Sequence, residues 1–264
     1  MIALRGKIAV VTGAAMGNGK GGAIELAKRG AHVVLCDISD KLTDTAAELK
    51  KQNFSVSAEQ FDVRSGEAAK AAMDRVAAEY GKIDILFNNA GVAKAVPFLA
   101  MDDETRDFHL DVNIKGIWNV AKAVYPHMVK AKYGRIINMS SVTGPMVVDA
   151  GETAYAMSKA AIWGFTKALA FEAAEHGITV NAICPGYILT PMAESLARDS
   201  NPDDPSLPLR GIAAAVPLKR LGTIEEIGQL VAFLGSDEAA YITGTQIIID
   251  GGSTLPETFG AIGV

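Results

Sequence analysis

The stretch TGAAMGNGKGGAIELA, residues 12–27, narrows the fold more than any other part of the sequence. It follows the short apolar run KIAVV and continues into a pattern typical of a helix. A glycine-rich turn between a parallel strand and a helix directs backbone N–H groups and the positive helix end toward one point, which suits a pyrophosphate. Gly13, Gly17 and Gly19 permit the turn and a close backbone approach. The turn could hold a dinucleotide, hold a triphosphate through Lys20, or be a simple connection.

Short β-branched runs alternate with longer amphipathic stretches along the whole chain. The runs lack polar alternation, which is typical of strands that are covered on both faces. The alternation predicts an α/β fold: a Rossmann-type doubly wound parallel sheet with helices on both faces and right-handed crossovers. We expect a single domain over residues 1–264. The main predicted helices cover residues 41–52, 67–80, 111–131, 155–175 and 224–234.

The composition excludes several classes of protein. The chain has 264 residues, 49% of them hydrophobic and 21% charged, which are ordinary values for a folded domain. Its net charge of -5 predicts no nucleic-acid partner. No apolar run approaches the ~18 residues of a membrane span, and no signal peptide is visible, so we expect a cytoplasmic protein without a membrane partner. Cys36 and Cys184 stand singly in apolar contexts, so we expect reduced core residues and no metal site.

The segment at residues 187–217 interrupts the alternation. It is rich in proline and cannot form one uninterrupted helix. Long irregular excursions in compact domains are typically lids or binding loops. We predict a substrate flap here, with a surface or subunit-contact insertion as the alternative.

Asp37 ends the second predicted strand, shortly after the glycine-rich turn. A carboxylate at this place accepts hydrogen bonds from an adenosine ribose and repels a 2′-phosphate. At ~4 Å and an effective dielectric of ~20, such a pair of like charges costs about 4 kcal/mol. Asp37 therefore predicts NAD rather than NADP, and its alternative role is that of a cap or turn residue.

The triphosphate alternative requires a glycine five positions before the Gly-Lys pair and a Ser or Thr after it. Ala14 and Gly21 occupy these positions. The sequence therefore argues strongly against a nucleotide kinase or NTPase, and we expect Lys20 to be a solvated lysine.

The stretch AYAMSKAAIWGF places Tyr155 and Lys159 on one face of a predicted helix. A nearby ammonium group lowers a tyrosine pKa from about 10, and such a tyrosine can act as a general acid or base. The pair alone is common in helices. Upstream, INMSSVTG ends a predicted strand with Ser140 and Ser141, and NNAG and VNIKG add three asparagines, Asn88, Asn89 and Asn113.

Together these motifs resemble the short-chain dehydrogenase/reductase family. Its TGxxxGxG loop is present as Thr12, Gly13, Gly17 and Gly19, its NNAG motif at residues 88–91, and its YxxxK motif as Tyr155 and Lys159. The resemblance covers essentially the whole chain. The stretches SSVTG, GETAYA, NAICPGY, TPMAES and IDGGSTLPET resemble one subgroup of oxidoreductases within the family.

The resemblance implies an NAD-dependent oxidoreductase that interconverts a small alcohol and a ketone or aldehyde. Tyr155 would exchange the alcohol proton, and Ser141 would hold the substrate carbonyl. Lys159 would lower the tyrosine pKa and bind the nicotinamide ribose, and Asn113 would anchor a proton-relay water. The interval from Ser141 to Tyr155 is one residue longer than is common in the family. A cofactor-sensing binding protein and an epimerase or dehydratase on the same fold are the alternatives.

The resemblance also implies cofactor and substrate contacts. The predicted cofactor-binding residues are Gly13, Gly17, Asn18, Gly19, Asp37, Asp62, Val63, Asn89, Ala90, Gly91, Tyr155, Lys159, Pro185, Gly186, Ile188 and Thr190, with a core role as the alternative for Ile188. The predicted substrate pocket comprises Ser141, Thr143, Met146, Val147, Val148, Tyr187 and Met192. This mostly apolar pocket favours neutral substrates. A charged side chain in the pocket, such as that of Lys94 or Arg198, would contradict this expectation. The helices that hold Asn113 and Tyr155, and the C-terminal DGGSTLPETFG, correspond to surfaces that pair in family tetramers, so a homotetramer is expected.

Three residues depart from the family pattern. Asn18 stands where a branched aliphatic residue is usual, and we expect it to change the NAD affinity in a direction that the sequence leaves open. Gly21 and Gly22 each cost a helix interior up to ~1 kcal/mol relative to Ala, so the first helical turn is expected to be loose or to begin late.

Overall fold

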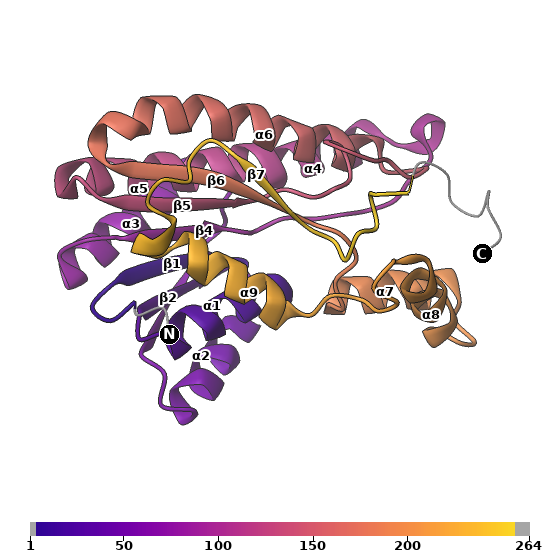
Figure 1. Ribbon diagram of the computed structural model, residues 1–264, viewed down its shortest axis with the longest axis horizontal. Helices are drawn as coiled ribbons and strands as arrows, with labels where there is room; N and C mark the ends of the chain where they lie inside the picture. Colours follow the sequence, from indigo (N-terminus) through magenta and orange to yellow (C-terminus); the bar gives the residue numbers. More distant parts are fainter. Residues whose placement is uncertain (1–3, 257–264) are drawn as a thin grey trace.

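The computed structural model describes residues 4–256, in which seven parallel strands form one sheet (Figure 1). The strand order is β3-β2-β1-β4-β5-β6-β7. This arrangement confirms the predicted doubly wound parallel sheet. The strands are β1 (Ile8–Thr12), β2 (His32–Asp37), β3 (Val56–Gln60), β4 (Ile85–Asn88), β5 (Gly134–Met139), β6 (Ile178–Pro185) and β7 (Gln246–Ile249).

Helices cover both faces of the sheet (Figure 1). One layer contains α1 (Gly17–Lys28), α2 (Lys41–Lys51) and α9 (Ile224–Leu234), and the other contains α3 (Gly66–Tyr80), α5 (Ile117–Ala131) and α6 (Thr153–Ala173). Successive strand residues point to opposite layers, so Val11 packs in the core under α1 while Val10 packs in the core under α5. Within the described residues no helix is long and apolar enough to cross a membrane.

The strand order reverses between β1 and β4, because the chain builds β2 and β3 on one side of β1 and the later strands on the other. In sheets of this kind, the crevice at the carboxyl ends of the strands on either side of the reversal binds ligands. The glycine-rich turn after β1 and the NNAG motif after β4 both lie there. The topology therefore joins two motifs that are more than seventy residues apart.

The expected loose start of the first helix is wrong, because α1 begins at Gly17 and both later glycines are buried. A methyl group added at Gly21 would collide with the carbonyl oxygen of Ile224 in α9. One added at Gly22 would lie 2.6 Å from the ring of Phe87 in β4. The two glycines thus permit close packing of α1 on α9 and on the sheet, which offsets their poor helix propensity.

Two other predicted segments differ in detail. The helix expected at residues 111–131 is preceded by α4 (Asp103–Leu110) and contains a π-helical turn at Asp111–Gly116 before α5. The segment at residues 187–217 is not irregular throughout. It forms α7 (Pro191–Ser200) and α8 (Ser206–Ala215), which stand at one side of the sheet beside its main body (Figure 1).

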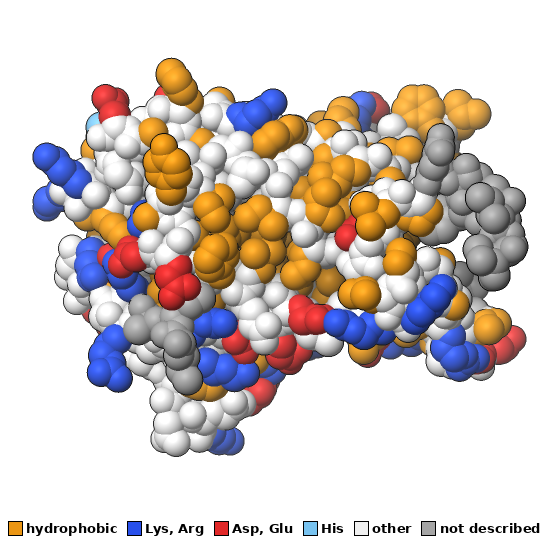
Figure 2. All heavy atoms as spheres, in the orientation of Figure 1, with side chains coloured by type: hydrophobic (Ala, Val, Ile, Leu, Met, Phe, Trp, Pro, Cys, Tyr) orange, Lys and Arg blue, Asp and Glu red, His pale blue; other side chains and the backbone are white. Residues whose placement is uncertain are grey.

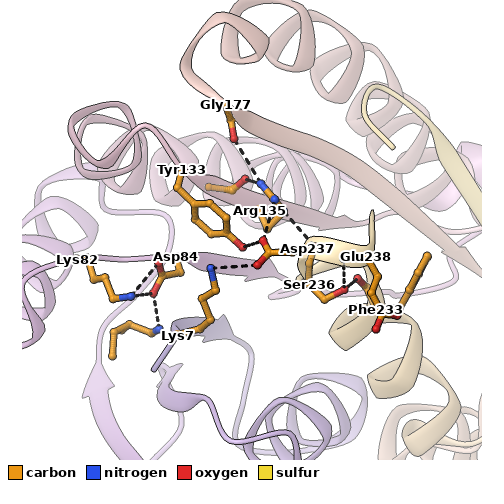
Figure 3. Close-up of polar contacts among 12 residues, drawn as sticks. Lys7, Lys82, Asp84, Tyr133, Arg135, Gly177, Phe233, Ser236, Asp237 and Glu238 are labelled. Carbon is orange, nitrogen blue, oxygen red and sulfur yellow. Dashed lines mark hydrogen bonds and ion pairs between the residues drawn. The ribbon is translucent and has the colours of Figure 1, made fainter. Parts of the chain in front are cut away.

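A cluster of polar side chains fastens the amino end of the sheet (Figure 3). Arg135 is 4% exposed and donates hydrogen bonds to the carbonyl oxygens of Ser236 and Gly134 at 3.2 and 2.8 Å. It also pairs with Asp237, which accepts a hydrogen bond from the Tyr133 hydroxyl at 2.8 Å. These contacts tie β5 to the segment after α9, at the end of the sheet opposite the glycine-rich turn.

Candidate active site

Three features shape the turn after β1. Gly13 has a φ of +66°, a conformation that favours glycine. A methyl group added at Gly19 would collide with the carbonyl oxygen of Gly13. Asn89 Nδ2 donates to the carbonyl oxygens of Thr12 and Gly13 at 3.0 and 3.3 Å, and the backbone N–H groups of Asn89 and Ala90 donate to Thr12 Oγ1. The turn after β1 and the loop after β4 therefore form one rigid unit.

Asp37 is engaged by the backbone on both carboxylate oxygens. Oδ2 accepts a hydrogen bond from the N–H of Ala15 at 3.0 Å, and Oδ1 accepts one from the N–H of Ser39 at 3.0 Å. Asp37 thus takes the alternative role of a turn residue, fixing the glycine-rich turn against β2. Each carboxylate oxygen has two lone pairs, so these contacts leave acceptor capacity for a ribose hydroxyl.

The start of α1 fits a dinucleotide on two observations. Its first turn contains no acidic residue, so its positive end is not compensated within that turn. Among the described residues, nothing hydrogen-bonds to the buried Oδ1 of Asn18. A methyl group added at Gly17 would lie 3.8 Å from the side chain of Thr190, so the turns after β1 and β6 face each other. A polar ligand between them would meet backbone N–H groups, which donate, and Asn18 Oδ1, which accepts.

Lys20 is not a free solvated lysine, because Nζ pairs with Glu48 of α2 at 2.7 Å.

Asp62 pairs with Arg64, whose guanidinium lies 2.6 Å from Oδ2. That contact lowers the pKa of Asp62. Val63 presents its carbonyl oxygen to the side chain of Asn119 at 3.0 Å.

At the end of β6, Pro185 and Gly186 form hydrogen bonds through their backbone, whereas the side chains of Ile188 and Thr190 have structural roles. Pro185 accepts a hydrogen bond from the N–H of Val142, and Gly186 donates one to Ile249 of β7. Ile188 is 8% exposed and packs into the core beneath α1, which favours the core role that was its alternative. Thr190 caps α7 by accepting the N–H of Ala193.

Four chain segments meet around Lys159, which is 3% exposed. Its Nζ donates to the carbonyl oxygen of Met139 at 2.9 Å. Asn113, in the π-helical turn, exchanges hydrogen bonds with the backbone of Val92, with Nδ2 2.9 Å and Oδ1 2.8 Å from its partner atoms. A methyl group added at Gly91 would lie 3.2 Å from Asn113 Oδ1 and 3.5 Å from Lys159 Nζ. Three predicted site residues are thus brought together, at the kind of helix irregularity that is frequent in functional sites.

The structure separates the two candidate serines. The Ser140 hydroxyl donates to the carbonyl oxygen of Lys159 at 2.9 Å, which is a structural bond to α6. Ser141 Oγ accepts the N–H of Thr143 at 3.1 Å, and its hydroxyl interacts with Tyr155. Of the two serines, Ser141 is therefore the one whose side chain acts on the Tyr155 hydroxyl, and it is the serine that the family resemblance implies.

The pKa of Tyr155 shifts in the direction opposite to the expected lowering. Burial raises the pKa of Tyr155 to about 12, and the hydrogen bond with Ser141 offsets part of that rise. Burial lowers the pKa of Lys159 to about 8. Lys159 Nζ lies 5.6 Å from the centre of the tyrosine ring, and desolvation outweighs the attraction between the two groups. At neutral pH, Tyr155 holds its proton and Lys159 is mostly charged.

The predicted substrate wall lies beside Ser141. Thr143 and Val147 form a bridge that holds a tight turn, and Met146, Val147 and Val148 are between 37% and 69% exposed. Met192 on α7 is 45% exposed. These side chains give the wall its expected apolar character.

Two carboxylates at this wall escaped the sequence analysis. The hydroxyl of Tyr187 donates to Asp149 Oδ2 at 3.2 Å. Burial and Asp149 raise the pKa of Glu152, whose charge in turn raises the pKa of Tyr155 and Tyr187. The sequence could have identified Glu152 through its position three residues before Tyr155. Lys94 is exposed and acts on Asp102 near α4, and Arg198 is exposed on α7.

Comparisons with known proteins agree with this geometry. A family model described as enoyl-(acyl carrier protein) reductase matches residues 13–254. The oxidoreductase UcpA of Salmonella typhimurium is 57% identical over 255 residues, covering 97% of each chain. UcpA-type oxidoreductases are the subgroup that the five stretches beginning with SSVTG resemble.

Solved structures give the same result. Levodione reductase matches with a TM-score of 0.91 and 30% identity, covering 95% of this chain and 98% of its own. A variant of actinorhodin polyketide ketoreductase with NADPH matches with a TM-score of 0.89 and 34% identity, covering 94% and 97%.

Proposed function

Because the chain belongs to the short-chain dehydrogenase/reductase family of oxidoreductases, we propose that it is an NAD(H)-dependent enzyme that interconverts an alcohol and a ketone or aldehyde. The observation that carries this proposal is the convergence of Ser141, Tyr155, Lys159 and Asn113 beside the rigid glycine-rich turn.

The cofactor site lies between the turns after β1 and β6. The N–H groups at the start of α1 would hold the pyrophosphate, and Asp37 would hold the adenosine ribose. Asn18 Oδ1 is an acceptor and would take a hydrogen bond from a hydroxyl or N–H group of the cofactor. When bound, a nicotinamide dinucleotide supplies the hydride donor or acceptor. The polyketide ketoreductase carries NADPH. The choice of NAD for this chain therefore depends on the charge of Asp37, which would repel a 2′-phosphate.

The side chains of the site handle the proton. In the direction of carbonyl reduction, Tyr155 donates its hydroxyl proton to the forming alcohol oxygen, and its high pKa keeps that proton in place beforehand. Ser141 orients the carbonyl oxygen toward Tyr155. Lys159 places a positive charge beside the phenolate that forms, and Asn113 positions a water that returns a proton from bulk solvent.

Two further features complete the proposal. Helices α7 and α8 would cover the substrate as a flap, because α7 carries the apolar side chains Met192 and Leu196, which are about half exposed. A homotetramer would bury apolar side chains exposed on α5, α6 and β7, among them Trp118, Phe171 and Ile248. Figure 2 shows apolar side chains gathered over the region of α9 and β7.

The direct test follows NADH and NADPH oxidation over a panel of ketones and aldehydes. We expect turnover with NADH, a weaker response to NADPH, and at least a hundredfold loss of kcat in Tyr155→Phe. Full activity of Tyr155→Phe would overturn the mechanism, and a preference for NADPH would overturn the role of Asp37.

A further inference from the structure

Glu152 occupies a position that helix formation does not explain. It directly precedes α6, and its carbonyl oxygen accepts the N–H of Ala156 at 2.7 Å. Its side chain makes no capping hydrogen bond. Ser, Thr, Asp and Asn stabilise a helix start in this position, whereas a glutamate that does not cap contributes little.

One oxygen of the Glu152 carboxylate lacks a donor. Its Oε2 is buried and, within residues 4–256, finds no hydrogen-bond partner. Folded proteins leave few buried polar atoms in this condition, because an unpaired buried acceptor loses its hydration without compensation. A bound molecule is a natural source of the missing donor.

Glu152 is close to Ser141 and Tyr155, the residues proposed to act on the substrate. Tyr155 follows three residues later on α6, and the Glu152 charge acts on the Tyr155 hydroxyl. The Thr143 side chain contacts the carboxylate, and the backbone N–H of Thr143 donates to Ser141 Oγ at 3.1 Å. Glu152 therefore belongs to the same pocket as Ser141 and Tyr155.

The other walls of the pocket limit what the donor can be. Asp149 adds a second negative charge beside Glu152, which disfavours a carboxylate. The predicted substrate residues Met146, Val147 and Met192 add partly exposed apolar side chains. An uncharged hydroxyl group satisfies the carboxylate oxygen without the desolvation cost of a full cation.

We propose that Glu152 is a specificity-determining residue that selects substrates with a hydroxyl group on the carbon next to the reacting carbonyl, and rejects those with a carboxylate there. The proposal rests on the oxidoreductase function proposed above. The substrate class is thus α-hydroxy ketones in reduction and vicinal diols in oxidation.

Three matched ketones test this proposal: 1-hydroxy-2-hexanone, 2-hexanone and 2-oxohexanoate, each with NADH. The wild-type protein should prefer the hydroxy ketone to 2-hexanone by at least tenfold in kcat/KM. Glu152→Gln should reduce this preference ~10- to 100-fold, mainly through KM, and should raise the relative kcat/KM for 2-oxohexanoate several-fold. The control Glu175→Gln removes the same charge beyond the far end of α6, where the side chain is 79% exposed, and should leave all ratios unchanged.

Opposite shifts for the hydroxy ketone and the keto acid distinguish recognition from a structural role. A uniform loss over all three ketones in Glu152→Gln, or an unchanged preference, would overturn the proposal.

A failure of the proposed function gives a separate result. If the wild-type protein consumes neither NADH nor NADPH with any of the three ketones, calorimetric titration with hexane-1,2-diol and hexan-2-ol still tests Glu152. Tighter binding of the diol by at least tenfold, lost in Glu152→Gln, supports the recognition role, whereas equal binding of the two alcohols overturns it.

Discussion

At the amino end of the sheet, Arg135, Tyr133 and Asp237 bond to one another and to nearby backbone (Figure 3). At the carboxyl end, Asn18 and Glu152 each keep a buried oxygen that finds no partner among residues 4–256. Both regions bury polar groups at the ends of the same strands. The first cluster serves the fold, while the proposed function has ligands supply the partners that the second one lacks.

Two further buried atoms in the described residues lack a partner, Thr179 Oγ1 on β6 and Gln246 Nε2 on β7. Both atoms lie at the amino ends of adjacent strands, and Thr179 pairs with Arg135 in the register of β5 and β6. The comparison therefore concerns the Arg135 cluster and the candidate active site, and not every buried polar group at the two ends of the strands.

The largest expected effect comes from Lys159→Met. Removing the buried ammonium should lower kcat by ~10³-fold, because the charge beside Tyr155 is lost. The free energy of unfolding should not fall, since burial disfavours the charged lysine. Steady-state kinetics and urea unfolding measure the two effects. A parallel loss of stability and activity would show that Lys159 has a structural role. That result would contradict the distinction between a cluster that serves the fold and a site that serves the reaction.

The same residue predicts a pH dependence. The Lys159 pKa is about 8 in the folded protein and 10.5 ordinarily, so between these values the unfolded chain binds more protons. The stability of the wild-type protein should therefore rise relative to Lys159→Met, by about 3 kcal/mol from pH 8 to pH 10.5. Urea unfolding at both pH values checks this, with the exposed Lys51→Met as the control. A constant gap between the wild-type protein and Lys159→Met would contradict the lowered pKa.

Arg135→Met tests the amino end of the sheet. It should lower the free energy of unfolding by about 3 kcal/mol, because two buried carbonyl oxygens lose their donor, while kcat stays at the wild-type value. Arg75→Met is the matched control, because Arg75 is 58% exposed where it pairs with Glu59, and exposed ion pairs contribute less than ~1 kcal/mol. A loss of kcat without a loss of stability in Arg135→Met would show that the cluster at the amino end of the sheet affects catalysis, which contradicts the comparison.

Gly21→Ala tests whether packing alone holds the glycine-rich turn. The added methyl group collides with α9 and should cost about 2 kcal/mol. Gly164→Ala in α6 meets nothing within 4 Å and should raise stability by up to ~1 kcal/mol. Thermal unfolding of both variants measures the contrast, and equal shifts would show that close α1–α9 contact is not required.

Asn18→Leu has the smallest expected effect. Removing an unpaired buried oxygen should raise stability by about 1 kcal/mol and weaken NADH binding several-fold, because the cofactor loses a polar partner. Thermal unfolding and NADH fluorescence titration report the two quantities. Unchanged or tighter NADH binding would contradict a role for Asn18 in holding the cofactor.

Much of the fold follows from the sequence, because β-branched runs and amphipathic stretches encode local structure. Helix α9 was predicted with its observed bounds, Ile224–Leu234. The π-helical turn at Asp111–Gly116 was not predicted, since it depends on contacts between Asn113 and the distant backbone of Val92. Gly21 was misjudged for the same reason, because helix propensity says nothing about the neighbouring α9.

The sequence by itself determined the chemical types present and their order: the glycine-rich turn, Asp37, and the pair Tyr155 and Lys159. Only the tertiary structure decided that Ser140 bonds to the backbone of α6, that burial raises the tyrosine pKa, and that one oxygen of Glu152 finds no partner among residues 4–256. Motifs are local and can be recognised along the chain. Desolvation and hydrogen-bond satisfaction depend on every group that surrounds an atom, and the fold alone brings those groups together.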